Sequence, residues 1–142
     1  MEDAKIVLIL NKVLEPGVAL NTAGHLGLGL LGRISASGLD TADTVNFQNY
    51  ADRDNNEHAF VSALPLIVLR AKSGEIRKCR AAFKDLNIPF VDYTGCMVGG
   101  TYLDQLERSR NTPEAELEYF GICALGSKTQ LDSVTRKFSL WK

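Results

Sequence analysis

Three side chains of this sequence, His25, Asp92 and Cys96, are of the types that carry out nucleophilic and acid–base catalysis. A cysteine thiolate activated by a neighbouring histidine is a strong nucleophile. Asp92 could orient or charge-stabilise the imidazole of His25, or act as a general base itself. The simpler alternatives are that Asp92 caps loop amides and that Cys96 is merely packed in the protein. We predict catalytic roles for the three residues on the condition that the fold brings them together.

A second group of residues could bind a ligand beside them. In open α/β sheets, ligands sit beyond the carboxyl ends of the parallel strands, where Asn11, Tyr93 and Thr94 are expected. The segment before the helix that starts near residue 101 could hold an anion, or only its own cap and water. The predicted ligand-binding residues are Asn11, Thr22, Tyr93, Thr94, Gly99, Gly100 and Thr101.

Glycines surround His25 in the stretch GHLGLGLLG, which contains a literal G-x-G-x-x-G at residues 27–32. A dinucleotide fingerprint forms the turn directly between strand and helix, whereas Gly27 comes 17 residues after the first predicted strand, inside a helical pattern. The pattern therefore predicts that this stretch is part of a glycine-rich helix. Four glycines there cost on the order of 4 kcal/mol relative to alanine. Either another helix or subunit, or a ligand, should approach this surface closely.

The elements that must position these residues follow from hydrophobic periodicity. Apolar runs predict strands over 5–10, 65–71, 89–93 and 118–125, and weak alternation over 44–48 could be an edge strand. Apolar side chains three and four residues apart predict helices over 17–34, 73–86 and 101–110, and a last helix from Ser127 through Trp141. The strands at 65–71 and 89–93 flank a helix and should be parallel. We predict one α/β domain over residues 1–142, a three-layer α/β/α sandwich around a mixed sheet of about four strands.

Composition narrows the function classes. The net charge is −1, from 16 basic and 17 acidic residues, so no basic excess indicates nucleic acid or a membrane surface. Three widely spaced cysteines argue against a disulfide framework and a zinc site, and fit a reducing cytoplasm. The spacing of Asp52, Asp54 and Asn56 is similar to the start of a calcium-binding loop. Such a loop needs glycine at its sixth position, where this chain has Glu57, so a calcium-binding loop is not predicted. We expect no metal, no cofactor, no secretory signal and no membrane span.

The chain resembles type II peptidyl-tRNA hydrolase over nearly its whole length. That family opens with K-x-V-L-V-V-R-x-D-L and G-K-x-A-A-Q-x-x-H, where this chain has KIVLILNKVL (5–14) and GVALNTAGH (17–25). GICALGS (121–127) is similar to the family's strand before its final helix. The chain is more closely similar to a set of small bacterial proteins of unknown function with this fold. The resemblance implies a peptidyl-tRNA hydrolase II-like fold.

The departures from that family bear on activity. This chain has Asn11, Val13, Val18 and Thr22 where the family has arginine, aspartate, lysine and glutamine, in that order. Only the family's histidine is clearly kept, as His25. Its D-A-G-x-T segment aligns loosely with residues 92–96. Peptidyl-tRNA is a polyanion whose binding relies on cations, so the loss of an arginine and a lysine disfavours that substrate.

Two functions are favoured over peptidyl-tRNA hydrolysis, which is the least favoured of three for this scaffold. We expect a small hydrolase-like protein that acts on a small amide- or ester-containing molecule, and the alternative is a non-catalytic module that binds a metabolite or a partner. A homodimer is compatible with either.

Overall fold

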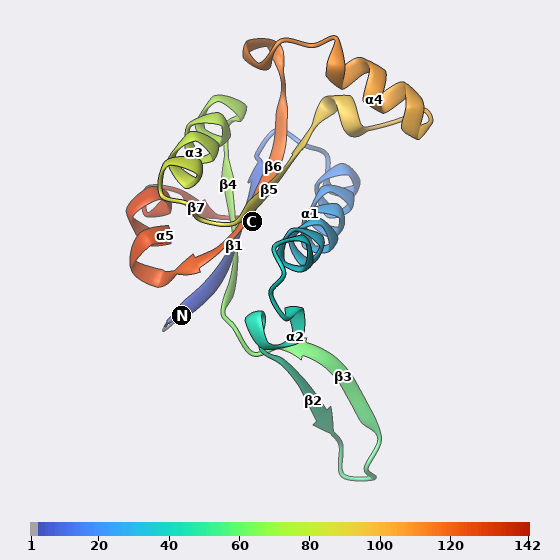
Figure 1. Cartoon of the computed structure of the whole chain (residues 1–142), viewed down its shortest axis with the longest axis vertical. Helices are drawn as coiled ribbons and strands as arrows, with labels where there is room; N and C mark the ends of the chain where they lie inside the picture. The colour runs from blue at the N-terminus through green and yellow to red at the C-terminus, as the bar shows by residue number, and fades with distance from the viewer. Residues whose placement is uncertain (1–2) are drawn as a thin grey trace.

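The computed structural model describes residues 3–142 and forms a mixed α/β fold (Figure 1). In chain order, its elements are β1 (Ala4–Asn11), α1 (Pro16–Ala36), α2 (Thr41–Thr44), β2 (Phe47–Ala51), β3 (Glu57–Ser62), β4 (Leu66–Ala71), α3 (Ser73–Asp85), β5 (Phe90–Thr94), the 3-10 turn η1 (Gly95–Met97), α4 (Tyr102–Arg110), η2 (Glu114–Glu116), β6 (Tyr119–Ser127), α5 (Lys128–Thr135) and β7 (Ser139–Leu140).

The main sheet has five strands in the order β5-β6-β1-β4-β7. β1 and β4 pair in parallel, whereas β6 is antiparallel to both β1 and β5, and β7 is antiparallel to β4. β4 and β5 therefore run in the same direction, as predicted, but β1 and β6 lie between them. The carboxyl ends of β1, β4 and β5 lie at one edge of the sheet.

The prediction that the last helix continues to Trp141 is wrong beyond residue 135. α5 ends at Thr135, and the chain then adds β7 to the edge of β4. The amide of Trp141 donates to the carbonyl of Val68 at 2.9 Å. Backbone pairing with an open strand edge replaces the helical hydrogen bonds there, which accounts for the fifth strand.

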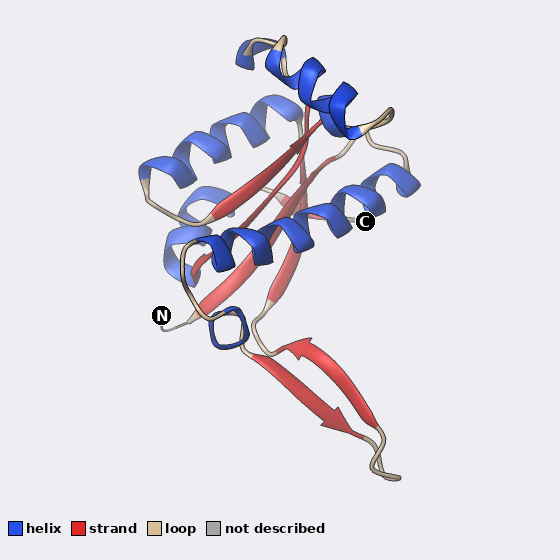
Figure 2. Cartoon of the chain, turned by 45° about the vertical axis from the view of Figure 1, so that its right-hand side comes forward, coloured by secondary structure: helices blue, strands red, loops and turns tan. Residues whose placement is uncertain are grey.

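Helices cover both faces of this sheet (Figure 2). α1 packs on β5, β6 and β1, while α3 and α5 pack on the other face of β1 and β6. Successive side chains of a strand point to opposite faces, so β1 supplies Ile6, Leu8 and Leu10 to the core under α1 and Val7 and Ile9 to the core under α3 and α5. Among residues 3–142, no helix is both long and apolar enough to cross a membrane.

The predicted edge strand at 44–48 is placed differently by the structure. β2 begins at Phe47 and, among residues 3–142, pairs only with β3, in a separate two-stranded hairpin that projects from the body (Figures 1 and 2). Most of its side chains are exposed. The hairpin therefore gains little from the core of the same chain.

Candidate functional site

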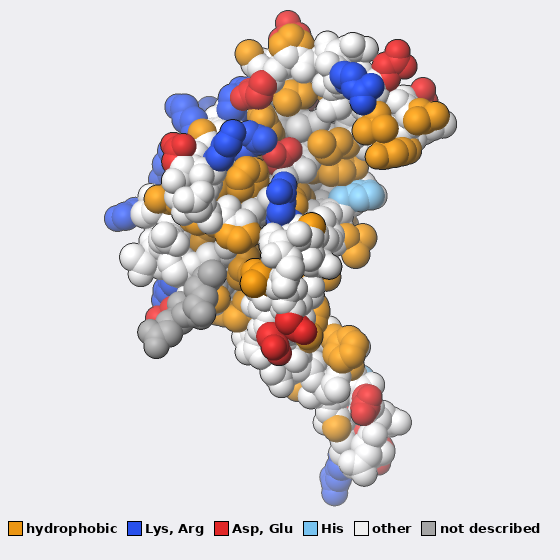
Figure 3. Space-filling model, viewed as in Figure 1, with side chains coloured by type: hydrophobic (Ala, Val, Ile, Leu, Met, Phe, Trp, Pro, Cys, Tyr) orange, Lys and Arg blue, Asp and Glu red, His pale blue; other side chains and the backbone are white. Residues whose placement is uncertain are grey.

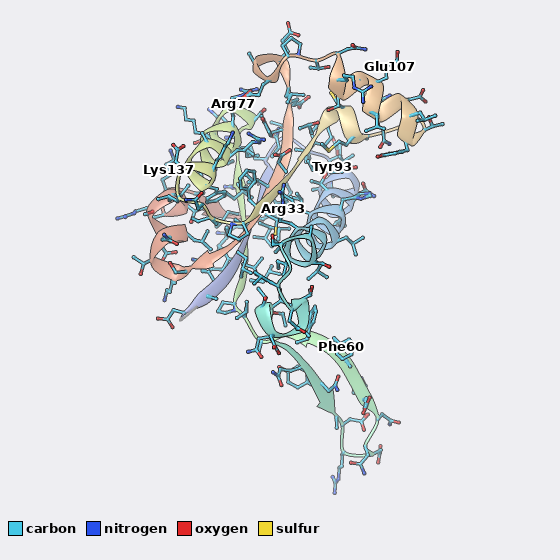
Figure 4. The ribbon with its side chains drawn as sticks, in the orientation of Figure 1. Arg33, Phe60, Arg77, Tyr93, Glu107 and Lys137 are labelled. Atoms are coloured by element: carbon cyan, nitrogen blue, oxygen red, sulfur yellow. The ribbon has the colours of Figure 1, made fainter. Side chains whose placement is uncertain are left out.

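His25 lies on the exposed side of α1 and stacks on Tyr93 of β5. The ring centroids are 5.1 Å apart and the ring planes differ by 14°. Tyr93 is buried on the α1 face of the sheet, and its hydroxyl donates to the carbonyl of Met97 at 3.1 Å. Burial raises the pKa of this hydroxyl above its ordinary value. The imidazole thus has a fixed apolar support on one ring face. Figure 4 labels Tyr93 beside α1.

A groove of about 380 Å³ opens beside this stacked pair. We call it the His25 groove; its lining consists of Asn21, His25, Tyr93, Met97, Val98, Gly99 and Gln105. Residues of α1 form one wall, and the segment after β5 together with α4 forms the other. Figure 3 shows hydrophobic side chains gathered over α4 on the same side of the molecule. The lining combines two side-chain amides and an imidazole with apolar surface.

The opposite wall is held by one arginine that the sequence analysis did not single out. Arg108 of α4 donates to the carbonyls of Cys96, Val98 and Gly99 at 3.1, 2.8 and 2.6 Å. Gln105 also donates to the carbonyl of Gly99, at 3.4 Å. The segment from residue 96 to 99 is therefore fixed to α4. No sequence motif marks this role, because arginine at the end of a helix is common on protein surfaces.

Asp92 does not contribute to the His25 groove, so the predicted contact with His25 is wrong. Its Oδ2 accepts from Nε of Arg80 on α3 at 2.7 Å, and this guanidinium lies over the ring of Phe90. Adjacent strand residues point to opposite faces, so Asp92 and Tyr93 cannot both face α1. The hydrogen bond to Asp92 raises the pKa of Arg80. Arg80 therefore neutralises the carboxylate on the far face of the sheet.

Cys96 and His25 line different hollows, so the predicted nucleophile–base contact is absent from this structure. Cys96 lies in a hollow of about 610 Å³ with residues of α4 and the turn that follows it. Its Sγ is 3.6 Å from Oγ1 of Thr112. No hydrogen bond within the described residues joins the thiol to a histidine.

Besides Tyr93, three of the predicted ligand-binding side chains are buried. Asn11 donates from Nδ2 to the carbonyl of Tyr119 at 2.9 Å, and its Oδ1 accepts from the amide of Val13 at 3.1 Å. Asn11 therefore fixes the turn after β1. Thr22 and Thr94 are also buried, and neither hydroxyl has a hydrogen-bond partner in the described part of the chain. None of the three lines the His25 groove.

The predicted anion site before α4 is closed by the helix's own cap. Oγ1 of Thr101 accepts from the amide of Asp104 at 3.2 Å, and Oδ2 of Asp104 accepts from the amide of Thr101 at 2.9 Å. The hydrogen bonds from Thr101 lower the pKa of Asp104. An anion at this terminus would therefore meet a carboxylate. Gly99 and Gly100 both have positive φ, 76° and 75°, which explains the glycine pair.

Metal binding has no support in the geometry of residues 3–142. No group of three or more His, Cys, Asp or Glu side chains is arranged there to hold an ion.

A family model described as "Protein of unknown function (DUF2000)" matches residues 4–142. The chain belongs to the DUF2000 family. This confirms the expected membership of an uncharacterised family. No curated protein matches the DUF2000 chain. It is similar in structure to the protein of unknown function Atu0240 from Agrobacterium tumefaciens strain C58, with a TM-score of 0.79, 19% identity and full coverage of both chains. At this identity, the likeness establishes the fold alone. These comparisons do not confirm the resemblance to peptidyl-tRNA hydrolase.

Proposed function

We propose that this DUF2000 protein binds a small amide-containing molecule in the His25 groove. The observation that carries the proposal is the exposed imidazole held on buried Tyr93 beside the side chains of Asn21 and Gln105. The groove's volume of about 380 Å³ falls within the usual range of small-molecule sites. Its position near the carboxyl end of β5 also agrees with the rule for open α/β sheets.

The chemistry of the lining supports this ligand class. Each side-chain amide offers both donors and an acceptor, so Asn21 and Gln105 can pair with an amide of the ligand. The free face of His25 and the thioether of Met97 can pack against a planar or apolar group. An amide carried on a small aromatic group would match both parts of the groove.

The geometry favours binding over hydrolysis. A catalytic imidazole is normally oriented by a third group and lies within hydrogen-bond reach of its nucleophile. His25 packs on a tyrosine ring, Asp92 pairs with Arg80, and Cys96 lies in another hollow. The three candidate catalytic residues thus lie in three different environments.

The scaffold and the cellular location belong to the same proposal. Helices on both faces of the sheet support a three-layer sandwich like that of type II peptidyl-tRNA hydrolase. Three cysteines without disulfide partners support a reducing cytoplasm. The groove has no arginine or lysine in its lining, which agrees with a ligand other than peptidyl-tRNA.

The test is an NMR titration of the full chain with N-acetylphenylalaninamide. We expect the ring signals of His25 to shift and saturate, while those of His58, in strand β3 of the hairpin, stay unchanged. His25→Ala should weaken binding, and the matched control His58→Ala should not. Saturable binding that is insensitive to His25→Ala, or no shift at His25, would refute the proposed site.

Hydrolysis is measured in parallel with the ethyl ester of N-acetylphenylalanine. We expect no cleavage above the uncatalysed rate. Cleavage that is lost in both His25→Ala and Cys96→Ala would overturn the binding proposal and support the hypothesis that the protein is a hydrolase.

A further inference from the structure

The outer face of α1 is unusually apolar for an exposed helix. No Asp, Glu, Lys or Arg occurs from residue 16 to residue 32. Leu20 and Leu28 are 73% and 71% exposed, and Gly24 lies between them on the same face. We call Leu20, Gly24 and Leu28 the α1 ridge. A helix face exposed to water normally carries charged or polar side chains, so the ridge indicates a surface that another molecule covers.

Packing within the chain does not account for the glycines of this face. A Cβ added at Gly24 or Gly27 would meet no atom within 4 Å. Alanine stabilises a helix more than glycine does, so a lone chain would gain from a methyl group at either position. Glycine is useful there if another backbone approaches closely, as it does where two helices cross at small residues.

The ridge is symmetric about Gly24. Leu20 precedes it by four residues and Leu28 follows it by four. In an antiparallel crossing at Gly24, Leu20 of one copy lies beside Leu28 of the other. We propose that two copies of this chain form a dimer through antiparallel packing of their α1 ridges.

The solvent-exposed area of the single chain supports the binding of a second copy. The chain exposes 8887 Å². A monomeric protein of its mass, 15.6 kDa, exposes about 7,250 Å² by the usual scaling with mass. The excess is roughly 1,600 Å², and a standard interface buries about 800 Å² per partner. The surplus is therefore large enough for a stable dimer.

The projecting hairpin completes this interface. It follows the C-terminal end of α1, whereas α4 lies beside the N-terminal half of α1, where Gln105 faces Asn21 and His25 across the groove (Figure 1). An antiparallel pair brings the hairpin of each copy to the α4 side of the other. Phe60 on the hairpin is 72% exposed, and Tyr102 and Leu103 on α4 are also exposed. An isolated two-stranded hairpin is marginally stable in water, so contact with a partner would stabilise it.

The test is sedimentation equilibrium of the full chain from submicromolar to high micromolar concentration. We expect a monomer–dimer equilibrium. Leu28→Lys should raise the dimer dissociation constant by roughly thirtyfold or more, the effect of losing a hot-spot residue. Leu28 is already exposed, so circular dichroism should show an unchanged fold. Leu86→Lys, at the end of α3, makes the same change in charge away from the ridge and should leave the constant unchanged.

A double variant tests the antiparallel register. Combining Leu20→Glu with Leu28→Lys places opposite charges beside each other only if the helices cross at Gly24, so dimerisation should recover relative to either single variant. The proposal would be overturned if the chain is monomeric at every concentration, or if Leu28→Lys leaves the dimer dissociation constant unchanged. Failure of the double variant to recover would overturn the register. His25→Ala should leave the dimer intact, which separates this test from that of the ligand site.

Discussion

Replacing Gly24 by alanine should have opposite effects on folding and on pairing. The added methyl group meets no atom within 4 Å in the single chain, so it introduces no clash. Gly24 lies inside the 21-residue helix α1, where alanine is about 1 kcal/mol more favourable than glycine. In the dimer, the same methyl group would separate two backbones that cross at this residue. The variant should fold more stably but dimerise more weakly.

The magnitude can be checked with urea at submicromolar protein concentration, followed by circular dichroism. We expect the free energy of unfolding to rise by about 1 kcal/mol with an unchanged m-value. The melting temperature should rise by about 3 °C for a chain of this length. At higher concentration, sedimentation should give a larger dissociation constant than that of the wild type.

Gly32→Ala is the matched control, because its Cβ also meets nothing and the position lies about 12 Å along α1 from the crossing at Gly24. It should give the same gain in stability and leave pairing unchanged. A fall in stability for Gly24→Ala at submicromolar concentration would refute the reasoning about the single chain. An unchanged dissociation constant would refute the crossing at Gly24.

Two further predictions concern the core. Gly121→Ala should lower the free energy of unfolding by about 1–3 kcal/mol, measured in urea, because the new Cβ would lie 2.8 Å from Cδ1 of Leu26 and 3.0 Å from the carbonyl oxygen of Ile9; a stability equal to the wild type would contradict this. Burial raises the pKa of the Cys79 and Cys123 thiols to about 11 and about 12, so both stay protonated and unreactive at pH 8. Iodoacetamide should then label only Cys96 in the native protein, as peptide mass spectrometry would show, and labelling should extend to all three in urea.

The sequence predicts the sheet well where burial is uniform. β1 and β6 are nearly continuous apolar runs because helices pack on both of their faces, and such runs are recognisable without any partner strand. The hairpin was less predictable. β3 contains Glu57 and His58 among exposed residues, so the burial that gives a strand its alternating pattern is missing. The sequence predicts helix where β7 lies, because Phe138 and Trp141 continue the three- and four-residue spacing of α5.

The candidate site was predicted in part. His25 and Tyr93 were both selected, and they line one groove. The sequence groups Asp92 with them because Asp92 and Tyr93 are both expected at the carboxyl end of a strand, with His25 on the first helix beside it. Its position next to Tyr93 in β5 already implied the opposite face, a conclusion available from strand alternation alone. The contact of Arg80 with Asp92 depends on how α3 lies on the sheet, which no local pattern gives.

The ion pair behind β5 has a mechanical consequence for the groove in front of it. Arg80 holds Asp92 against α3, so the strand that carries Tyr93 is fixed from the rear. The facing wall, from residue 96 to residue 99, is tied to α4 chiefly by Arg108. An incoming molecule would meet a floor that is held from behind by α3 and a wall that is held by α4. The width of the opening would therefore follow the position of α4, and changes along that helix would alter which molecules fit.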